Sequence, residues 1–327
     1  MTPLNRRQLL RLSSLAAATA LPSMTWAQAA YPAKPITLIV PQPPGGDADA
    51  VCRSLQSKMQ EVLGQPVVID NRAGAGGNIG TAVGAKAAPD GYTMTFVNQG
   101  TMALNPALYP NPGYKVDQFA PVTWLTSIDL VLVAHPSLPA NNLRELLALA
   151  RKEPGKYTYA TAGNGSANHL AGEMLKSMAK VDITHVPYRG GGPAIIAALG
   201  GEVSMAVAFP LAAIPHIKGG KLKALAVTGK QRSRALPDLP TVAESGVDGY
   251  EFASWMGFVV PRRTPDAIIQ RLHAAAVAAL KQPDVAERLS ASMTEPVGVG
   301  PVEFGALIAR EGQRWPTMIK QFGMKVD

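Results

Sequence analysis

The sequence predicts an α/β fold built as two lobes, and three observations point to it. Apolar runs of strand length alternate with helical patterns almost throughout the chain. The 327 residues exceed the roughly 100–200 residues of one ordinary domain. A hydrophobic content of 47% against 17% charged residues supplies enough apolar side chains for more than one core and excludes a disordered chain.

The expected strands are short and continuously apolar, a pattern typical of parallel sheets covered by helices on both faces. They span residues 36–40, 67–70, 92–97, 131–134, 157–161, 183–186, 203–209 and 222–228. We therefore expect mostly parallel sheets. Residues 105–121 and 231–250 are the least regular stretches, and we expect the chain to cross between the lobes there.

Helices are expected where apolar residues recur at intervals of three and four. In residues 167–178 they fall at i, i+3, i+4, i+7, i+8 and i+11, which predicts an amphipathic helix. The same reasoning predicts helices over residues 51–62, 143–151, 265–280 and 301–322. The last two have proline near their starts, where helices favour it.

The first thirty residues have the composition of an export signal. Residues 6–11 form a basic segment with three arginines, residues 12–21 are apolar and small, and residues 25–29 offer small-x-small cleavage. The apolar run is too short to span about 30 Å of hydrocarbon. We expect a signal peptide over residues 1–29, removed on export to the periplasm, which lowers the net charge from +8 to about +5. The Arg6-Arg7 pair leaves the general secretory route and the twin-arginine route both open.

The remaining composition argues against several classes of protein. Basic residues are scattered, with no long run interleaved with aromatic residues, so nucleic-acid binding is not expected. Cys52 is the only cysteine, which rules out a disulfide within the chain. The five histidines lack metal-binding spacing, and no serine lies in a G-x-S-x-G motif. We expect no metal, no cofactor and no enzymatic activity.

Three loops that lead from a strand into a helix form the candidate ligand site, because ligands of α/β sheets collect beyond the carboxyl ends of strands. The candidate residues are Gln42, Pro44, Gly45, Gly46 and Asp49 in the first loop, Thr161, Gly163, Gly165 and Ser166 in the second, Arg189 and Gly190 in the third, and Thr101 after the strand at 92–97.

Glycine amides and helix N-termini favour an anion by about 0.3–1 kcal/mol when exposed and up to about 2 kcal/mol when partly buried. If the loops face each other, they would hold a small carboxylate. Taken alone, each loop could equally be a turn, and Arg189 could be either a counter-ion or simply solvated. Asp47 and Asp49 are candidates to cap the helix that follows the first loop.

The same loops, with other short motifs, resemble those of the Bug family, the periplasmic solute-binding proteins of tripartite tricarboxylate transporters. The likeness covers nearly the whole mature chain. Its motifs lie at residues 31–36, 40–41, 43–46 with Asp49 and Arg53, 63–68, 71–72 with 74–77, 89–93, 105–106 with 108–109, 154–156, 169–171, 185–188, 225–228, 236–241, 249–251 and Trp255.

This resemblance implies a periplasmic-binding-protein fold of the two-lobe Venus flytrap kind, type II, with a ligand cleft between the lobes. Lobe one would comprise residues 31–126 plus 255–327, and lobe two residues 127–254. The family holds a ligand carboxylate at the loop matched by residues 43–46, and the loop matched by residues 161–166 closes on it. Gln42, Cys52 and Ser204 depart from the residues usual in the family, so no particular ligand is carried over.

We therefore predict a monomeric periplasmic protein that captures a small carboxylate and delivers it to a tripartite tricarboxylate-type permease. The carboxylate could be a di- or tricarboxylate, an amino acid or an aromatic acid. Two alternatives remain open. The protein could be a ligand sensor that docks on a membrane receptor, or a secreted hydrolase or lyase that uses Ser166 with His169 or His185.

Overall fold

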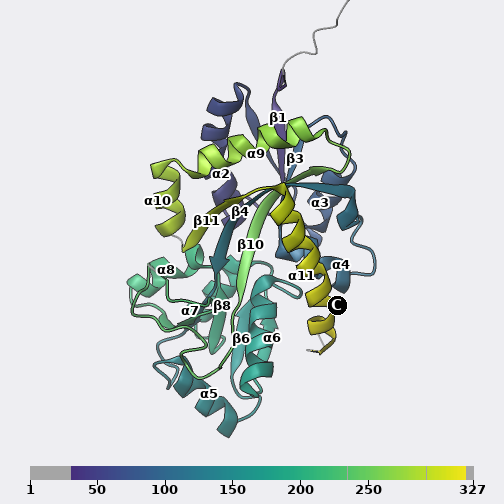
Figure 1. The fold of residues 1–327 in the computed structure, drawn as a ribbon. Coiled ribbons are helices and arrows are strands. Elements are labelled where there is room, and N and C mark those ends of the chain that lie inside the picture. Colours follow the sequence, from purple (N-terminus) through teal and green to yellow (C-terminus); the bar gives the residue numbers. More distant parts are fainter. Residues whose placement is uncertain (1–30, 234, 292, 322–327) are drawn as a thin grey trace, which may run out of the picture. The chain divides into compact units, whose positions relative to one another are not determined.

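Two β-sheets with helices packed on them organise the computed structural model, which describes residues 31–321 apart from 234 and 292 (Figure 1). The expected signal peptide lies outside the described residues. From residue 34 onward the described chain forms one compact unit that contains both sheets.

The first sheet has six strands in the order β11-β4-β10-β3-β1-β2. Their bounds are β1 Ile36–Val40, β2 Val67–Asn71, β3 Thr93–Asn98, β4 Phe119–Asp129, β10 Ala253–Pro261 and β11 Thr294–Val299. Strand β1 pairs in parallel with β2 and β3, whose carboxyl ends therefore lie at the same edge of the sheet. The loop that follows β1 is the first candidate ligand loop.

The second sheet has five strands in the order β7-β6-β8-β5-β9. Their bounds are β5 Val131–Ala134, β6 Thr158–Thr161, β7 Thr184–Pro187, β8 Met205–Ala208 and β9 Lys223–Val227. Strand β6 pairs in parallel with β7 and β8. The loops after β6 and β7 therefore leave the same edge of this sheet, and they are the second and third candidate loops.

The helices follow the apolar periodicity of the sequence. Their bounds are α2 Asp47–Leu63, α3 Asn78–Ala85, α4 Asn105–Leu108, α5 Leu143–Lys152, α6 Ala167–Ala179, α7 Gly191–Leu199, α8 Pro210–Lys218, α9 Asp266–Leu280, α10 Pro283–Ala291 and α11 Pro301–Gln321. A π-helical turn, Gly100–Leu104, follows β3. Helices α2, α3 and α9 pack on the first sheet, and α6, α7 and α8 pack on the second (Figure 1).

Helix α11 packs on both halves of the described chain. Phe304 and Leu307, near its start, lie in a core cluster with Val97 and Trp255 of the first sheet. Trp315 and Ile319, near its end, lie in another cluster with side chains of α5, α6, β5 and β6. The last helix therefore links the cores that cover the two sheets.

The expectation of mostly parallel sheets was wrong. Strand β10 pairs antiparallel with both β3 and β4, and β5 pairs antiparallel with both β8 and β9. Both β5 and β10 are central strands, and nearly every residue in them is buried. A strand buried on both faces has the same continuous apolar sequence in either direction, so the pattern could not distinguish the two pairings.

Strands β4, β10 and β11 and helix α10 were not predicted from the sequence. Strand β4 starts inside the stretch that was expected to be irregular, and its buried positions follow no simple alternation. The chain leaves the first sheet where β4 ends at Asp129 and enters the second where β5 begins at Val131, not within residues 105–121. It returns between β9 and β10, and this interval includes residues 231–250 as expected.

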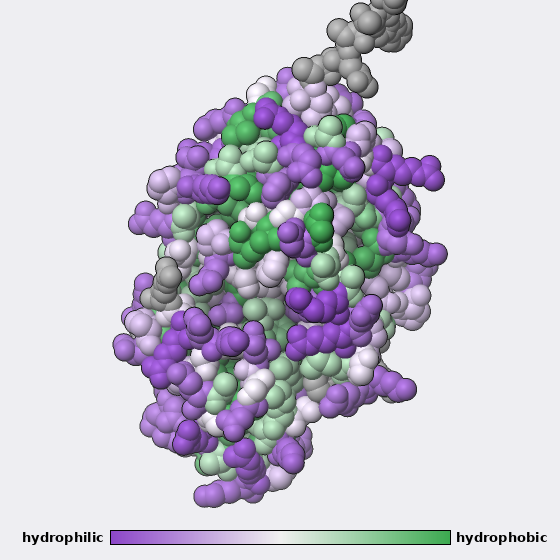
Figure 2. Space-filling model, viewed as in Figure 1, coloured by the Kyte–Doolittle hydropathy of each residue, from purple (hydrophilic) through white to green (hydrophobic). Residues whose placement is uncertain are grey.

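Polar side chains cover most of the face shown in Figure 2, with apolar ones scattered among them. Within the described residues, none of the helices combines the length and the apolar character needed to span a bilayer.

Candidate functional site

The first loop is closed by the carboxylate of Asp49, in the first turn of α2. Its Oδ2 accepts the amide of Gly45 at 2.9 Å and Nε of Arg53 at 2.8 Å, while Oδ1 accepts Nδ2 of Asn71 at 3.0 Å. Burial opposes the charge on Asp49, but these hydrogen bonds outweigh it and hold the pKa of the carboxyl below its usual value. Gly45 has a φ of +80°, a conformation that glycine adopts without strain. The loop is therefore fixed without a ligand.

Helix α2 begins without a side-chain cap. Its N-cap residue is Gly46, and the expected capping by Asp47 or Asp49 was wrong, because Asp49 bonds the amide of Gly45 outside the helix. Within the described part of the chain, the Gly46 amide has no hydrogen-bond partner. The positive end of a 17-residue helix and an unpaired amide therefore coincide at Gly46.

Asp47 adds a negative charge at this position. Its Oδ1 is buried and has no hydrogen-bond partner among the described residues. Burial raises the pKa of Asp47 to about 6, although a hydrogen bond from its own backbone amide acts in the opposite direction. From the sequence, Asp47 was predicted only as a possible cap, and its charge beside Gly46 was not foreseen.

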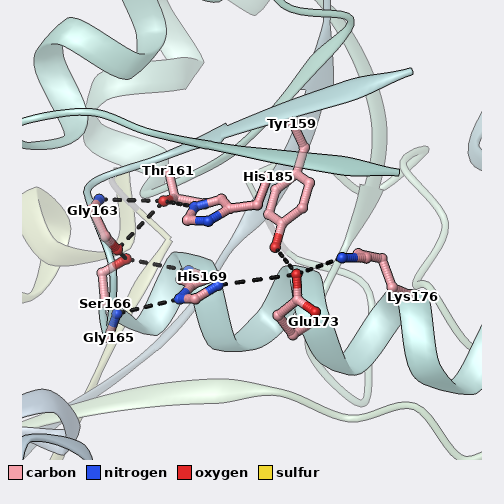
Figure 3. Close-up of polar contacts among 9 residues, drawn as sticks. All are labelled: Tyr159, Thr161, Gly163, Gly165, Ser166, His169, Glu173, Lys176 and His185. Carbon is pink, nitrogen blue, oxygen red and sulfur yellow. Dashed lines mark hydrogen bonds and ion pairs between the residues drawn. The ribbon is translucent and has the colours of Figure 1, made fainter. Parts of the chain in front are cut away.

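The second loop, between β6 and α6, bonds mainly to itself (Figure 3). Ser166 caps α6 by accepting the amide of His169 at 3.2 Å, and its hydroxyl donates to the carbonyl of Gly163 at 2.7 Å. The amide of Gly163 donates to Oγ1 of Thr161, and the amide of Gly165 donates to Nδ1 of His169, both at 3.2 Å. The amides of both candidate glycines are therefore already satisfied within the loop.

A buried polar cluster lies directly beside the second loop (Figure 3). The imidazoles of His169 and His185 stack with ring centroids 3.9 Å apart and planes 10° from parallel. Nε2 of His185 lies 2.6 Å from Oγ1 of Thr161. Glu173 accepts the hydroxyl of Tyr159 at 2.6 Å. Burial lowers the pKa of each histidine to about 4, so both rings are neutral at pH 7.

His169 hydrogen-bonds near the start of its helix, where Nδ1 accepts the amide of Gly165. Glu173 was not predicted from the sequence, and His185 was named there only as a possible partner of Ser166. The spacing of His169 and Glu173, four residues apart on one helix face, was a usable signal. No sequence signal places His185, because its approach depends on the pairing of β6 with β7.

The third loop is joined to the second by two backbone hydrogen bonds. The amide of Tyr188 donates to the carbonyl of Thr161, and the amide of Gly190 donates to that of Ala162. Gly190 is the N-cap of α7 and, like Gly46, provides no side-chain cap. Arg189 is exposed and makes no hydrogen bond or ion pair with any other described residue. Its charge therefore remains available to a ligand carboxylate.

The remaining candidates lie near the first loop. Thr101 is 1% exposed, and its hydroxyl and amide both bond to Asn98 at the end of β3. A Cβ on Gly77 would lie 3.0 Å from Thr101 and 3.2 Å from the carbonyl of Pro41. The absence of a side chain at Gly77 therefore lets Thr101 and Pro41 pack against the same point of the backbone. The carbonyl of Gln42 accepts Nδ2 of Asn71, and Pro44 is exposed.

The candidate residues predicted from the sequence thus lie in two groups. The second and third loops are hydrogen-bonded to each other, and Thr101 lies beside the first loop. That the two groups face each other across a cleft stays a prediction. A groove of about 900 Å³ elsewhere, between α11 and α4, contains none of the candidates, and its largely apolar lining has few groups that would hold a carboxylate.

The geometry disfavours catalysis by Ser166. Its hydroxyl bonds to Gly163 and to the backbone of His169, and Nδ1 of His169 is occupied by the amide of Gly165. A serine nucleophile needs an imidazole nitrogen as its base within hydrogen-bond reach. Among the described residues, no cluster of three or more histidine, cysteine, aspartate or glutamate side chains could hold a metal ion.

Comparison with known proteins agrees with this geometry. The family model described as "Tripartite tricarboxylate transporter family receptor" matches residues 51–324. Protein BugT of Bordetella pertussis is 38% identical over 298 residues, which cover 90% of this chain and 91% of BugT.

Two solved structures are similar over nearly their whole length. "R. palustris Rpa4515 with adipate" is 34% identical, with a TM-score of 0.85, covering 90% of this chain and 99% of that one. "MatC (Rpa3494) from Rhodopseudomonas palustris with bound malate" is also 34% identical, with a TM-score of 0.80, covering 88% and 100%. The two-lobe α/β fold is thereby confirmed. The chain belongs to the tripartite tricarboxylate transporter receptor family, TctC, and is a periplasmic solute-binding protein of the Bug type, not an enzyme.

Proposed function

We propose that this protein binds a small dicarboxylate, with one carboxylate at the start of α2 and the other at the paired second and third loops. The observation that carries the proposal is that α2 and α7 both begin at glycines without a side-chain cap. An uncapped helix N-terminus leaves amides and a partial positive charge for an anion, worth up to about 2 kcal/mol when partly buried.

The direct contacts in this proposal come from groups that the fold leaves unpaired. They are the amide of Gly46 and the side chains of Gln42 and Arg189. Asp49, Thr101, Thr161 and Ser166 are already bonded within their own loops, so we assign them to shaping the site. Pro44 and Gly45 set the path of the first loop, and Gly163, Gly165 and Gly190 set that of the others.

The choice of a dicarboxylate rests on the two similar structures, which are described with adipate and with bound malate. Both ligands carry two carboxylates, which suits one anion site on each half of the chain. The lobes would comprise residues 31–126 plus 255–327 and residues 127–254, and closure of the lobes would bring the two anion sites together. Export would remove residues 1–29, and the loaded protein would deliver its ligand, as a monomer, to a tripartite tricarboxylate-type permease.

A thermal-shift screen of the mature protein tests this proposal. The panel contains mono-, di- and tricarboxylates, including malate and adipate, with the matching diamides as uncharged controls. A dicarboxylate at about 100 times its Kd stabilises the folded state by about 2.7 kcal/mol, while its diamide does not. No shift with any carboxylate, or equal shifts with acids and diamides, would contradict the proposal.

A further inference from the structure

The two glycine amides of the second loop are each connected to an imidazole of the polar cluster. The Gly165 amide donates directly to Nδ1 of His169 at 3.2 Å. The Gly163 amide donates to Oγ1 of Thr161, which lies 2.6 Å from Nε2 of His185. Gly163 and Gly165 have φ values of +121° and +73°, so the loop depends on backbone conformations that these side-chain contacts hold in place.

The Gly165 bond fixes the tautomer of His169. An amide N–H can only donate, so Nδ1 must carry the lone pair and Nε2 must carry the proton. Nε2 lies 4.0 Å from Oε1 of Glu173, on the side where a carboxylate stabilises that proton. Glu173 is itself held by the hydroxyl of Tyr159 at 2.6 Å and by Nζ of Lys176 at 2.8 Å.

The cluster is largely buried and closely packed. His169 is 5% exposed and Thr161 is fully buried. A Cβ on Gly172 would lie 2.2 Å from the ring of Tyr159, so the absence of a side chain there allows Tyr159 to reach Glu173. Removing imidazoles and a carboxylate from water has a cost that apolar side chains of the same size would avoid. In return, this cluster supplies oriented acceptors for the loop amides.

We propose that His169 is a positioning residue for ligand binding. It acts through the Gly165 amide to hold residues 161–166 in one conformation before the carboxylate arrives, and it does not touch the ligand. This inference rests on the proposed function of the same loop. A loop ordered in advance loses less conformational freedom on binding, so the contribution of His169 appears in the affinity.

Two matched substitutions separate this role from simple packing. In His169→Asn, Oδ1 falls close to the position of Nδ1 and can accept the Gly165 amide. In His169→Gln, the side-chain amide reaches the position of Nε2 and cannot accept the Gly165 amide. Both replacements are polar and neutral. The measurements are hydrogen exchange of the Gly165 amide in the ligand-free protein and the affinities for malate and adipate by calorimetry.

We expect His169→Asn to keep the Gly165 amide protected and to bind close to wild-type affinity. His169→Gln should accelerate exchange at Gly165 and weaken binding about tenfold, the effect of losing one hydrogen bond. Equal losses of affinity in both variants, or an unchanged Gly165 amide in His169→Gln, would overturn the inference. If wild type binds neither malate nor adipate, the proposed dicarboxylate fails, but exchange at Gly165 still decides the positioning role.

The tautomer of His169 can also be measured in the wild-type protein, so this test does not depend on the folding of a variant. Nitrogen-15 NMR of the imidazoles at pH 7 should show His169 neutral, with Nε2 protonated and Nδ1 carrying the lone pair. A proton on Nδ1 would exclude the bond from Gly165 and overturn the inference.

Discussion

The carboxylate of Asp49 bonds the amide of Gly45 at 2.9 Å and thereby ties the first loop to the first turn of α2. The same side chain accepts Arg53 and Asn71, so three segments of the chain meet at one acid. The carboxylate orients the loop that leads to Gly46, and both of its oxygens already accept hydrogen bonds from the chain.

Replacing Asp49 with alanine should therefore lower both stability and ligand affinity. Loss of hydrogen bonds to a charged group costs about 2 kcal/mol in the free energy of unfolding. Because the pKa of Asp49 is lowered, its contribution is complete above the unfolded value near 3.8 and is lost as pH falls through the folded value. Urea unfolding measures the change. Asp248→Ala, at an exposed position, is the control and should stay within about 0.5 kcal/mol of wild type.

Asp47 should behave in the opposite way. Its pKa is raised to about 6 by burial, so the folded state holds a proton that the unfolded state releases from about pH 3.8 upward. Stability therefore falls as pH rises through this window, and the full penalty is present above pH 6. Asp47→Asn should be about 1 kcal/mol more stable than wild type at pH 7, after allowance for partial solvent screening, and no more stable at pH 4. An equal gain at both pH values would mean that charge is not the cause.

Elements with a simple local apolar pattern were predictable from the sequence. The strand over residues 36–40 and the helix that ends at Ala179 were predicted almost to the residue, because their buried faces follow a simple apolar pattern. The loops around Gly46 and Ser166 were correctly placed at helix starts, because the apolar pattern of each helix begins directly after them.

The features that could not be predicted depend on contacts between residues distant in sequence. Strand β10 pairs with β3 and β4, more than a hundred residues earlier, and its direction has no local signal. Similarly, nothing near residue 185 indicates that His185 stacks on His169, because that contact requires β6 and β7 to pair first. Residue types identified the loops, but the hydrogen bonds within them determine which groups remain available for a ligand.

The stacked histidines should make stability depend on pH between about 4 and 6.5. Each has a pKa lowered to about 4 in the folded state, chiefly by burial, with Lys176 acting in the same direction on both rings and Glu173 in the opposite direction on His185. The hydroxyl of Tyr159, which bonds Glu173, stays protonated throughout this range. The unfolded state therefore binds more protons in this window, so their contribution to stability is complete above pH 6.5 and is lost as pH falls toward 4.

Urea midpoints of wild type and His169→Asn, measured every half pH unit, test this dependence. The variant should lose less stability than wild type between pH 6.5 and 4, because it has one titrating ring fewer. Asp47 acts with the opposite sign in the same range, so the difference between the two proteins is the informative quantity. Parallel curves would show that His169 does not titrate as its burial requires.

Arg189 should affect affinity and leave stability unchanged. It is exposed and has no partner in the described part of the chain, so Arg189→Gln should change the free energy of unfolding by less than about 0.5 kcal/mol. If Arg189 contacts a ligand carboxylate, the variant should bind malate or adipate about tenfold more weakly, and the difference should shrink in high salt. Arg263→Gln, another exposed arginine, serves as the control. Equal affinities for the two variants would remove Arg189 from the site.

Two glycines in helices should respond oppositely to the same added methyl group. At Gly172 in α6, a Cβ would lie 2.2 Å from the ring of Tyr159, whereas at Gly312 in α11 it would meet no atom within 4 Å. Gly172→Ala should therefore lower the free energy of unfolding by about 1–3 kcal/mol through overpacking. Gly312→Ala should raise it by about 0.5–1 kcal/mol, because alanine loses less backbone entropy in a helix. Urea unfolding of both variants measures the two changes, and an unchanged stability of Gly172→Ala would show that Tyr159 can move away from the added methyl group.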